Sequence, residues 1–162
     1  MLLTTCNQTA LRALRVFRSA RGTLPAERHE LPRPDPFPQQ RWSKRLVPLG
    51  ALGLASPPSV EDPVEVIVPN AASRTQASFF SCHVMPAGLP ADSFLTLGNG
   101  LCIPCPELLF LQMVAIMTPE AHVLLGYELC GTYALFPGGN ESYRKLKTAR
   151  TTTEDLRAFF LA

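Results

Sequence analysis

Two cysteines three positions apart, in the sequence Cys102-Ile103-Pro104-Cys105, form the short motif with the most specific chemistry in this chain. Two thiolates at this spacing can bind one zinc ion or exchange a disulfide. A redox dithiol needs its cysteines on the first turn of a helix, whose dipole lowers the thiol pKa, but Pro106 keeps Cys105 out of the helical conformation. A zinc site would need further ligands from residues that form no second pair of this kind, namely Cys82, His83, His122 and Cys130.

The simpler interpretation of this motif is structural. We expect a strand-to-helix corner that places one thiol in the core and the other at a helix cap. Zinc or thiol chemistry at Cys102 and Cys105 remains the alternative, and no other cofactor is expected.

Basic side chains gather in the first 50 residues, which hold nine Lys and Arg against three Asp and Glu. Clustered cations supply the phosphate affinity of nucleic-acid-binding proteins. A solvent-exposed basic helix and a solvated linker end are the simpler interpretation, because the net charge of the whole chain is only +2. A mitochondrial presequence is a further alternative, because no acidic residue precedes Glu27. The candidate nucleic-acid contacts are Arg12, Arg15 and Arg18 on a predicted helix and Arg41, Lys44 and Arg45 around Trp42.

Sequence motifs of known catalytic chemistry are missing. The chain contains neither the G-x-S-x-G motif of serine hydrolases nor a phosphate-binding G-x-x-x-x-G-K loop. Glu107 and Glu120 each follow a proline, and we expect them to complement the dipole of a helix N-terminus. We therefore expect a protein that is not an enzyme.

Short helices and strands must position these residues. Apolar periodicity predicts a helix over residues 8–20 and a terminal helix over 153–161. The β-branched run 64–68 and the segment 78–84 are typical of strands. Residues 94–97 and 101–103 flank Gly98-Asn99-Gly100, which favours a hairpin with a type I′ turn.

Two helices that each begin at a proline are predicted at 106–117 and 119–130. Nine of the eleven residues from Glu107 to Met117 are apolar, so this helix must be buried. If it were exposed in a monomer, it would require a partner or a further domain. In the second helix we expect Val123, Leu124 and Tyr127 to share a side, and Tyr127 and Leu129 to pack against the first helix.

These elements predict the α+β class, with a small and mainly antiparallel sheet covered by the buried helix pair. Nine of the sixteen prolines lie between Pro25 and Pro63, where the missing backbone donors favour irregular chain. The expected domain organisation is a basic N-terminal helix over 1–23, a Pro-rich linker over 24–63 and an α+β core domain over 64–162.

The apolar runs are shorter than the roughly 18 to 20 residues that span a bilayer, so no membrane association is expected. Five cysteines without the dense spacing of secreted domains favour reduced thiols inside a cell. We therefore expect a cytoplasmic protein.

One part of the chain resembles a known group of proteins. The stretch ELLFLQM at 107–113 and the stretch LGYELCGTY at 125–133 resemble a group of coriobacterial proteins. In that group a domain akin to the AbiEi abortive-infection antitoxin precedes a very-short-patch-repair-like endonuclease domain. Further residues that fit the same pattern are Val66 to Pro69, Arg74, His83, Pro90 and Thr9 to Leu11.

This resemblance implies a noncatalytic accessory or regulatory domain of a bacterial defence or DNA-processing protein, acting through protein or DNA contacts. The nuclease part would follow residue 162, so the resemblance supplies no catalytic residue, and the chain could be a truncated product. A metal- or thiol-binding module built on Cys102 and Cys105 is the alternative function.

Overall fold

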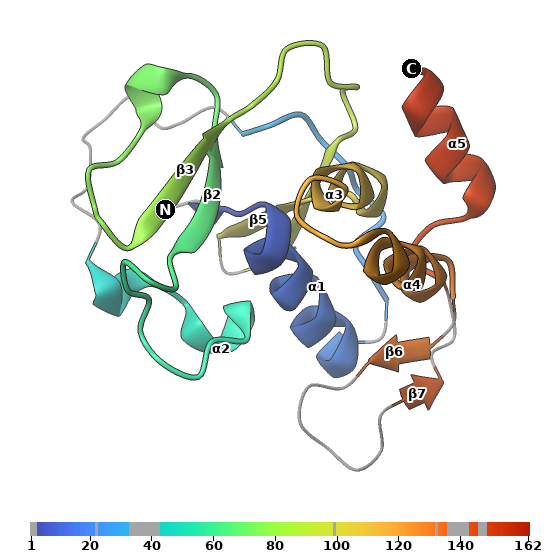
Figure 1. Ribbon diagram of the computed structural model, residues 1–162, viewed down its shortest axis with the longest axis horizontal. Helices are drawn as coiled ribbons and strands as arrows, with labels where there is room; N and C mark the ends of the chain where they lie inside the picture. The colour runs from blue at the N-terminus through green and yellow to red at the C-terminus, as the bar shows by residue number, and fades with distance from the viewer. Residues whose placement is uncertain are drawn as a thin grey trace.

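The computed structural model describes residues 3–21, 23–32, 43–98, 100–131, 133–135, 143–145 and 149–162 (Figure 1). The described helices and strands are, in chain order, β1 (Leu3–Thr4), α1 (Asn7–Arg21), the 3-10 helix η1 (Lys44–Leu46), α2 (Leu49–Leu52), β2 (Val64–Val68), the 3-10 helix η2 (Ala71–Ser73), β3 (Phe80–Val84), β4 (Phe94–Gly98), β5 (Leu101–Pro104), α3 (Pro106–Met113), α4 (Pro119–Cys130), β6 (Tyr133–Leu135), β7 (Tyr143–Lys145) and α5 (Thr153–Leu161).

The first sheet contains the predicted hairpin. β4 pairs with β5 in antiparallel fashion, and β1 lies on the other side of β5 and is parallel to it. Gly98 and Gly100 have φ angles of 97° and 72°, which non-glycine residues rarely adopt. The hairpin is therefore confirmed, while Asn99 of the expected type I′ turn lies outside the described residues.

The second sheet differs in detail from the expectation. β2 and β3 are parallel, because residues 69–79 carry the chain back to the start of β2 before β3 begins. A crossover between parallel strands needs about a dozen residues, and this connection is close to that length. Among the strands expected between residues 64 and 103, antiparallel pairing is thus found only for β4 with β5. β6 and β7, which were not expected, form a further antiparallel pair. The α+β class itself is confirmed.

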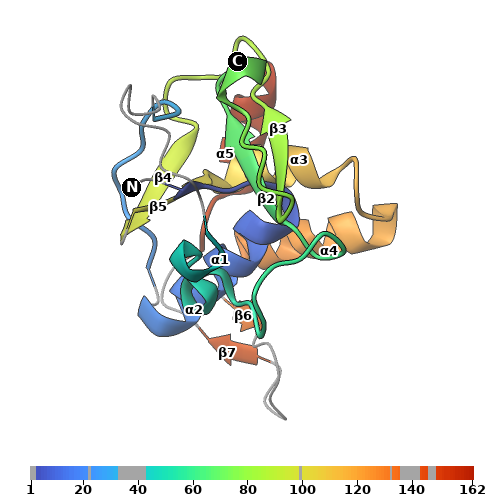
Figure 2. The ribbon, with the colours of Figure 1, turned by 90° about the vertical axis from the view of Figure 1, so that its left-hand side faces the viewer.

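Helix α1 lies at the centre of the molecule and packs against α2, α3 and β2 (Figures 1 and 2). Its side chains Ala10, Leu11 and Leu14 are buried in the same hydrophobic core as residues of β2, β5 and α3. The expectation of a solvent-exposed helix was therefore wrong. One stripe of α1 carries small and aliphatic residues that suit a core, and Arg18, four positions after Leu14, is buried on the same stripe. Arg12 and Arg15 are only partly buried.

The segment expected to be a linker also contributes to the core in its described part. Val47 and Leu52 are buried there, and Leu52 lies on α2 beside α1. The core therefore includes side chains from all three predicted parts of the chain.

The predicted pair of Pro-started helices is present, but only the first is buried on most sides. Cys105 and Thr118 are the N-caps of α3 and α4, as the prolines predicted. Leu109 and Met113 of α3 are inaccessible to solvent. Helix α3 ends at Met113 rather than at 117, and residues 114–116 form a turn. In Figure 2 the corner between α3 and α4 projects from the right-hand side of the molecule.

Helix α4 faces the core with only part of its apolar surface. Leu125 and Leu129 are buried, whereas Leu124 and Tyr127 are 68% and 74% exposed. The burial expected for Leu129 is confirmed and that expected for Tyr127 was wrong, because α4 lies at the edge of the fold with solvent along one side. Within the described residues, no helix combines the length and the apolar character that crossing a bilayer requires.

Candidate functional site

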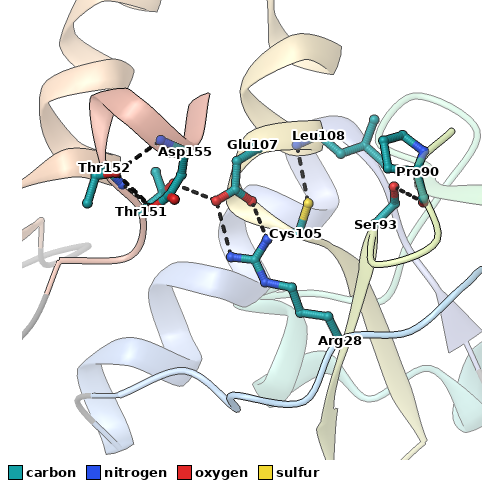
Figure 3. A network of polar contacts seen from close by, with 9 residues as sticks. All are labelled: Arg28, Pro90, Ser93, Cys105, Glu107, Leu108, Thr151, Thr152 and Asp155. Carbon is teal, nitrogen blue, oxygen red and sulfur yellow. Dashed lines mark hydrogen bonds and ion pairs between the residues drawn. The ribbon is translucent and has the colours of Figure 1, made fainter. Parts of the chain in front are cut away.

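The cysteine motif forms a buried corner between β5 and α3. Cys102 lies on β5, and Cys105 caps α3 by accepting a hydrogen bond at its Sγ from the Leu108 backbone N–H at 3.5 Å (Figure 3). Both side chains are inaccessible to solvent. Burial raises the pKa of each thiol to about 12, so both remain protonated near neutral pH. The expected strand-to-helix corner is confirmed.

The residues named as further zinc ligands do not converge on this corner. Cys82 and His83 lie on β3 of the other sheet. His122 lies on α4, where its Nε2 is 2.9 Å from the carbonyl oxygen of Phe110, and Cys130 is the last residue of α4. In the part of the chain that the structure describes, no three Cys, His, Asp or Glu side chains are grouped as metal ligands.

Glu107 sits beside this corner and holds three segments together (Figure 3). Its carboxylate accepts hydrogen bonds from both terminal nitrogens of Arg28, at 3.0 and 3.1 Å, and from the Thr151 hydroxyl. Burial disfavours the charged carboxylate, but the hydrogen bonds from Thr151, from its own backbone and from Arg28 outweigh burial and lower its pKa. Glu107 was expected only as a partner of the helix dipole; its buried ion pair was missed.

The predicted basic residues do not form one surface. Arg12 is partly exposed and lies 3.6 Å from Asp62. Arg15 donates to the Glu128 carboxylate through Nε and Nη2, at 3.1 and 2.6 Å, and Arg18 is only 1% exposed. The assignment of Arg18 as a surface contact for nucleic acid was wrong, because the apolar packing of α1 carries this side chain into the interior.

The second group of predicted basic residues lies at η1. Lys44 and Arg45 are exposed, and the Lys44 ammonium lies over the ring of Phe79 at 5.9 Å from its centroid. Arg41 and Trp42 lie outside the described residues. Nucleic-acid contact by Arg12, Lys44 and Arg45 stays a prediction.

Glu128 is the centre of a charged cluster that the sequence reasoning missed. Its carboxylate, buried near the end of α4, receives Arg15 from α1 and the Nη1 of Arg150 at 2.9 Å. Arg18 donates to the carbonyl oxygens of Glu128 and Gly131, at 3.5 and 3.1 Å, and so caps the end of α4. Burial opposes ionisation of Glu128, but the hydrogen bond and charge of Arg15 and the charge of Arg150 lower its pKa. One sequence signal could have revealed this cluster: Glu128 is a charged residue beside Leu125 and Leu129, on the side of α4 that faces the core.

A serine, a histidine and a carboxylate also meet beside the N-terminus of α1. His83 Nε2 is 3.3 Å from Ser81 Oγ and 3.7 Å from Glu65 Oε1. A nucleophilic relay uses the two ring nitrogens separately, whereas here one nitrogen faces both partners. Glu65 instead caps α1, because its oxygens accept hydrogen bonds from Asn7 Nδ2 at 3.0 Å and from the Thr9 backbone N–H at 3.4 Å. This group fits a structural role.

Exposed apolar side chains gather around α4. Of the ten exposed large apolar residues in the described parts of the chain, five lie between positions 114 and 127. Val123, Leu124 and Tyr127 share the solvent-facing side of α4, because residues three or four apart lie on one face of a helix. We call these three residues the α4 surface. Val114 and Ile116 precede it on the projecting turn.

Comparison of the chain with protein-family models, with curated proteins and with solved structures finds no match. The resemblance to proteins with an AbiEi-like domain therefore stays a prediction.

Proposed function

We propose that this chain is a noncatalytic, cytoplasmic accessory domain of a bacterial defence or DNA-processing system, and that it binds a protein partner through the α4 surface. The observation that carries this proposal is the exposure of Val123, Leu124 and Tyr127, at 56%, 68% and 74%. Apolar side chains grouped in this way favour association, because contact with a partner removes them from water.

Protein binding is favoured over DNA binding by the charges of the described residues. The α4 surface contains no cation, and the nearest charged residue on the same side of the helix is the acidic Glu120. Two of the predicted phosphate contacts, Arg15 and Arg18, are engaged with Glu128 and the end of α4. Among the described residues, phosphate binding would therefore rest on Arg12 and on the separate group of Lys44 and Arg45 at η1.

The alternative function, a metal- or thiol-binding module, receives no such support. A zinc site would need further ligands, and none converges on Cys102 and Cys105 among the described residues. Disulfide exchange requires an accessible thiolate. Cys102 and Cys105 are fully buried, and their raised pKa of about 12 disfavours the thiolate. We therefore do not retain it as a second candidate.

The partner to test first is a very-short-patch-repair-like endonuclease domain encoded beside this chain in its genome, because the resemblance implies such a neighbour. Both proteins would be purified and mixed, and complex formation would be measured by isothermal titration calorimetry. We expect the wild-type chain to bind. Leu124→Ser and Tyr127→Ser should each weaken binding by about tenfold or more, because losing a well-packed interface anchor costs about 2 kcal/mol.

Val60→Ser is the matched control, because Val60 is 65% exposed and lies in the segment between α2 and β2. All three variants should keep the wild-type melting temperature, since the replaced side chains are in solvent. Absence of binding, or equal binding by all three variants, would exclude the α4 surface as the interface with this partner. If the chain instead bound duplex DNA at ~50 mM salt and lost it on neutralising Lys44 and Arg45, the function would move to DNA contact.

A further inference from the structure

Strand β3 pairs with β2 alone among the described strands, so its other side is an open edge. The N–H of Met85, directly after β3, donates to the carbonyl oxygen of Val68 on β2 at 2.9 Å. A strand directs the backbone groups of alternate residues to opposite sides, so Cys82 and Val84 direct theirs away from β2. In the described part of the chain, no other element donates to or accepts from these outward groups of Cys82 and Val84.

The open edge of β3 lacks the features that usually protect such edges. The outer edge of β4, by contrast, is covered, because Phe94 exchanges two backbone hydrogen bonds of 2.9 Å with His29. Proteins protect open edges with lysines, prolines or bulges. The sequence of β3, Phe-Ser-Cys-His-Val, contains neither lysine nor proline, and its pairing with β2 has no register shift. This edge is therefore suited to pairing with a further strand.

The backbone groups on this edge are complementary to themselves. When a second β3 strand runs antiparallel with its His83 opposite His83 of the first, Cys82 of each copy lies opposite Val84 of the other. Opposed residues whose N–H and C=O groups face each other exchange two hydrogen bonds. This register therefore forms four hydrogen bonds, which use every outward N–H and C=O group of Cys82 and Val84 in both copies.

The side chains also suit this register. Cys82 is partly buried and Val84 is 39% exposed, and their pairing across the two copies removes Val84 from water. No Lys, Arg, Asp or Glu lies on β3, so no such like charges meet. Each His83 brings a carboxylate to the symmetric contact, because its Nε2 lies 3.7 Å from Glu65 Oε1.

We propose that this chain forms a homodimer in which two β3 strands pair in antiparallel fashion about a twofold axis at His83. The two β2–β3 sheets thereby become one continuous sheet. A twofold contact uses the same edge in both copies, so the pairing is closed and admits no third chain at β3. Figure 1 shows β3 on the left and α4 on the right, with α1 between them, so this edge is separate from the α4 surface.

Sedimentation velocity of the full chain over a series of micromolar concentrations measures the dimer. We expect a reversible equilibrium between monomer and dimer. Val84→Pro should raise the dimer dissociation constant by about tenfold or more, because it removes an N–H donor at two symmetric positions. The pairing with β2 is spared, because this N–H points away from β2.

Val60→Pro is the matched control for this substitution. Val60 is 65% exposed, it lies outside the strands, and its N–H has no partner among the described residues. This variant should form the dimer with the wild-type dissociation constant.

Val84→Cys tests the register of the pairing. The Cα atoms of a hydrogen-bonded antiparallel pair lie about 5.5 Å apart, which is within the range of a disulfide. Oxidation with copper phenanthroline should therefore link Cys82 of each copy to the introduced cysteine of the other, as mapped by mass spectrometry. Adding Cys82→Ser to this variant should abolish the link, and Val60→Cys should give no link to Cys82.

A chain that stays monomeric at every concentration would overturn the proposal and would leave the β3 edge to a strand of another protein. A dimer that Val84→Pro does not weaken would also overturn it, as would a dimer of Val84→Cys without the expected link to Cys82. If Val84→Pro does not fold, the cross-link decides the matter alone.

Discussion

Burial decides the chemistry of individual residues in this protein. Cys102 and Cys105 have the spacing of a metal or redox pair, but the corner between β5 and α3 removes both thiols from solvent. The proline after Cys105 was enough to predict its role as an N-cap. The pairing of Glu128 with Arg15 and Arg150 could not be predicted, because Arg15 is 113 positions away from Glu128 and local periodicity carries no information about contacts at that distance.

Thiol labelling should follow this burial. We expect at most two of the five cysteines, Cys82 and Cys130, to react rapidly with a disulfide reagent in the native protein, because the other three are buried. All five should react in denaturant, where no thiol is shielded. The measurement is the colour yield of the reagent over time, with Cys82→Ser and Cys130→Ser assigning the fast signals. Fast labelling of Cys102 or Cys105 would contradict the corner described above.

At the scale of elements, helix starts were predictable and helix orientation was not. Pro106 and Pro119 marked the first residues of α3 and α4, because a proline suits a position whose N–H has no helical partner. Helix α4 is apolar around most of its circumference, so its sequence does not indicate which side faces the core. Tyr127 was consequently assigned to the interior, whereas it lies in solvent.

Two glycines at α2 provide a matched test of local geometry. Gly53 ends α2 with φ at 65°, and a Cβ there would lie 2.9 Å from Val16 Cγ2 on α1. We expect Gly53→Ala to destabilise the fold by about 1–2 kcal/mol from the left-handed conformation, with a further cost from the contact with Val16. Urea denaturation followed by circular dichroism would measure this.

Gly50→Ala is the control for this change. Gly50 lies inside α2, and a Cβ at this position has no atom within 4 Å. Because alanine is the better helix former, this substitution should stabilise the protein by about 0.5–1 kcal/mol. Equal effects of the two substitutions would show that the contact between α2 and α1 is not as described.

At the scale of the whole molecule, two buried carboxylates join segments that are distant in sequence. Glu107 connects α3 to Arg28 and to Thr151, and Glu128 connects α4 to α1 and to Arg150. The α+β class could be predicted from the order of the short helices and strands. The central position of α1 could not be predicted, because its arginines suggested a helix exposed to solvent.

These carboxylates should make the fold sensitive to acid. Both pKa values are lowered in the folded state, so each group adds stability above its ordinary pKa of 4.5 and loses this contribution as the pH falls through the folded pKa. The free energy of unfolding should therefore be level near neutral pH and fall below about pH 5. Urea denaturation at a series of pH values down to about pH 3 would measure it.

The variant Glu128→Gln isolates one of these contributions. It should lower the free energy of unfolding by about 3–5 kcal/mol at neutral pH, because buried arginines lose their counter-charge, and by much less in acid. Glu27→Gln is the control, since Glu27 is exposed, and it should follow the wild-type curve. A Glu128→Gln deficit that is the same at every pH would point to lost packing rather than lost charge.

The pairing of β1 with β5 also dictates the order of events on the ribosome. Leu3 leaves the exit tunnel well before its strand partner Leu101, which lies 98 positions later in the chain. Helix α1 must then wait, with its aliphatic side uncovered, until β5 and α3 have been translated. A nascent chain of this protein is therefore a natural client for a ribosome-associated chaperone during that interval.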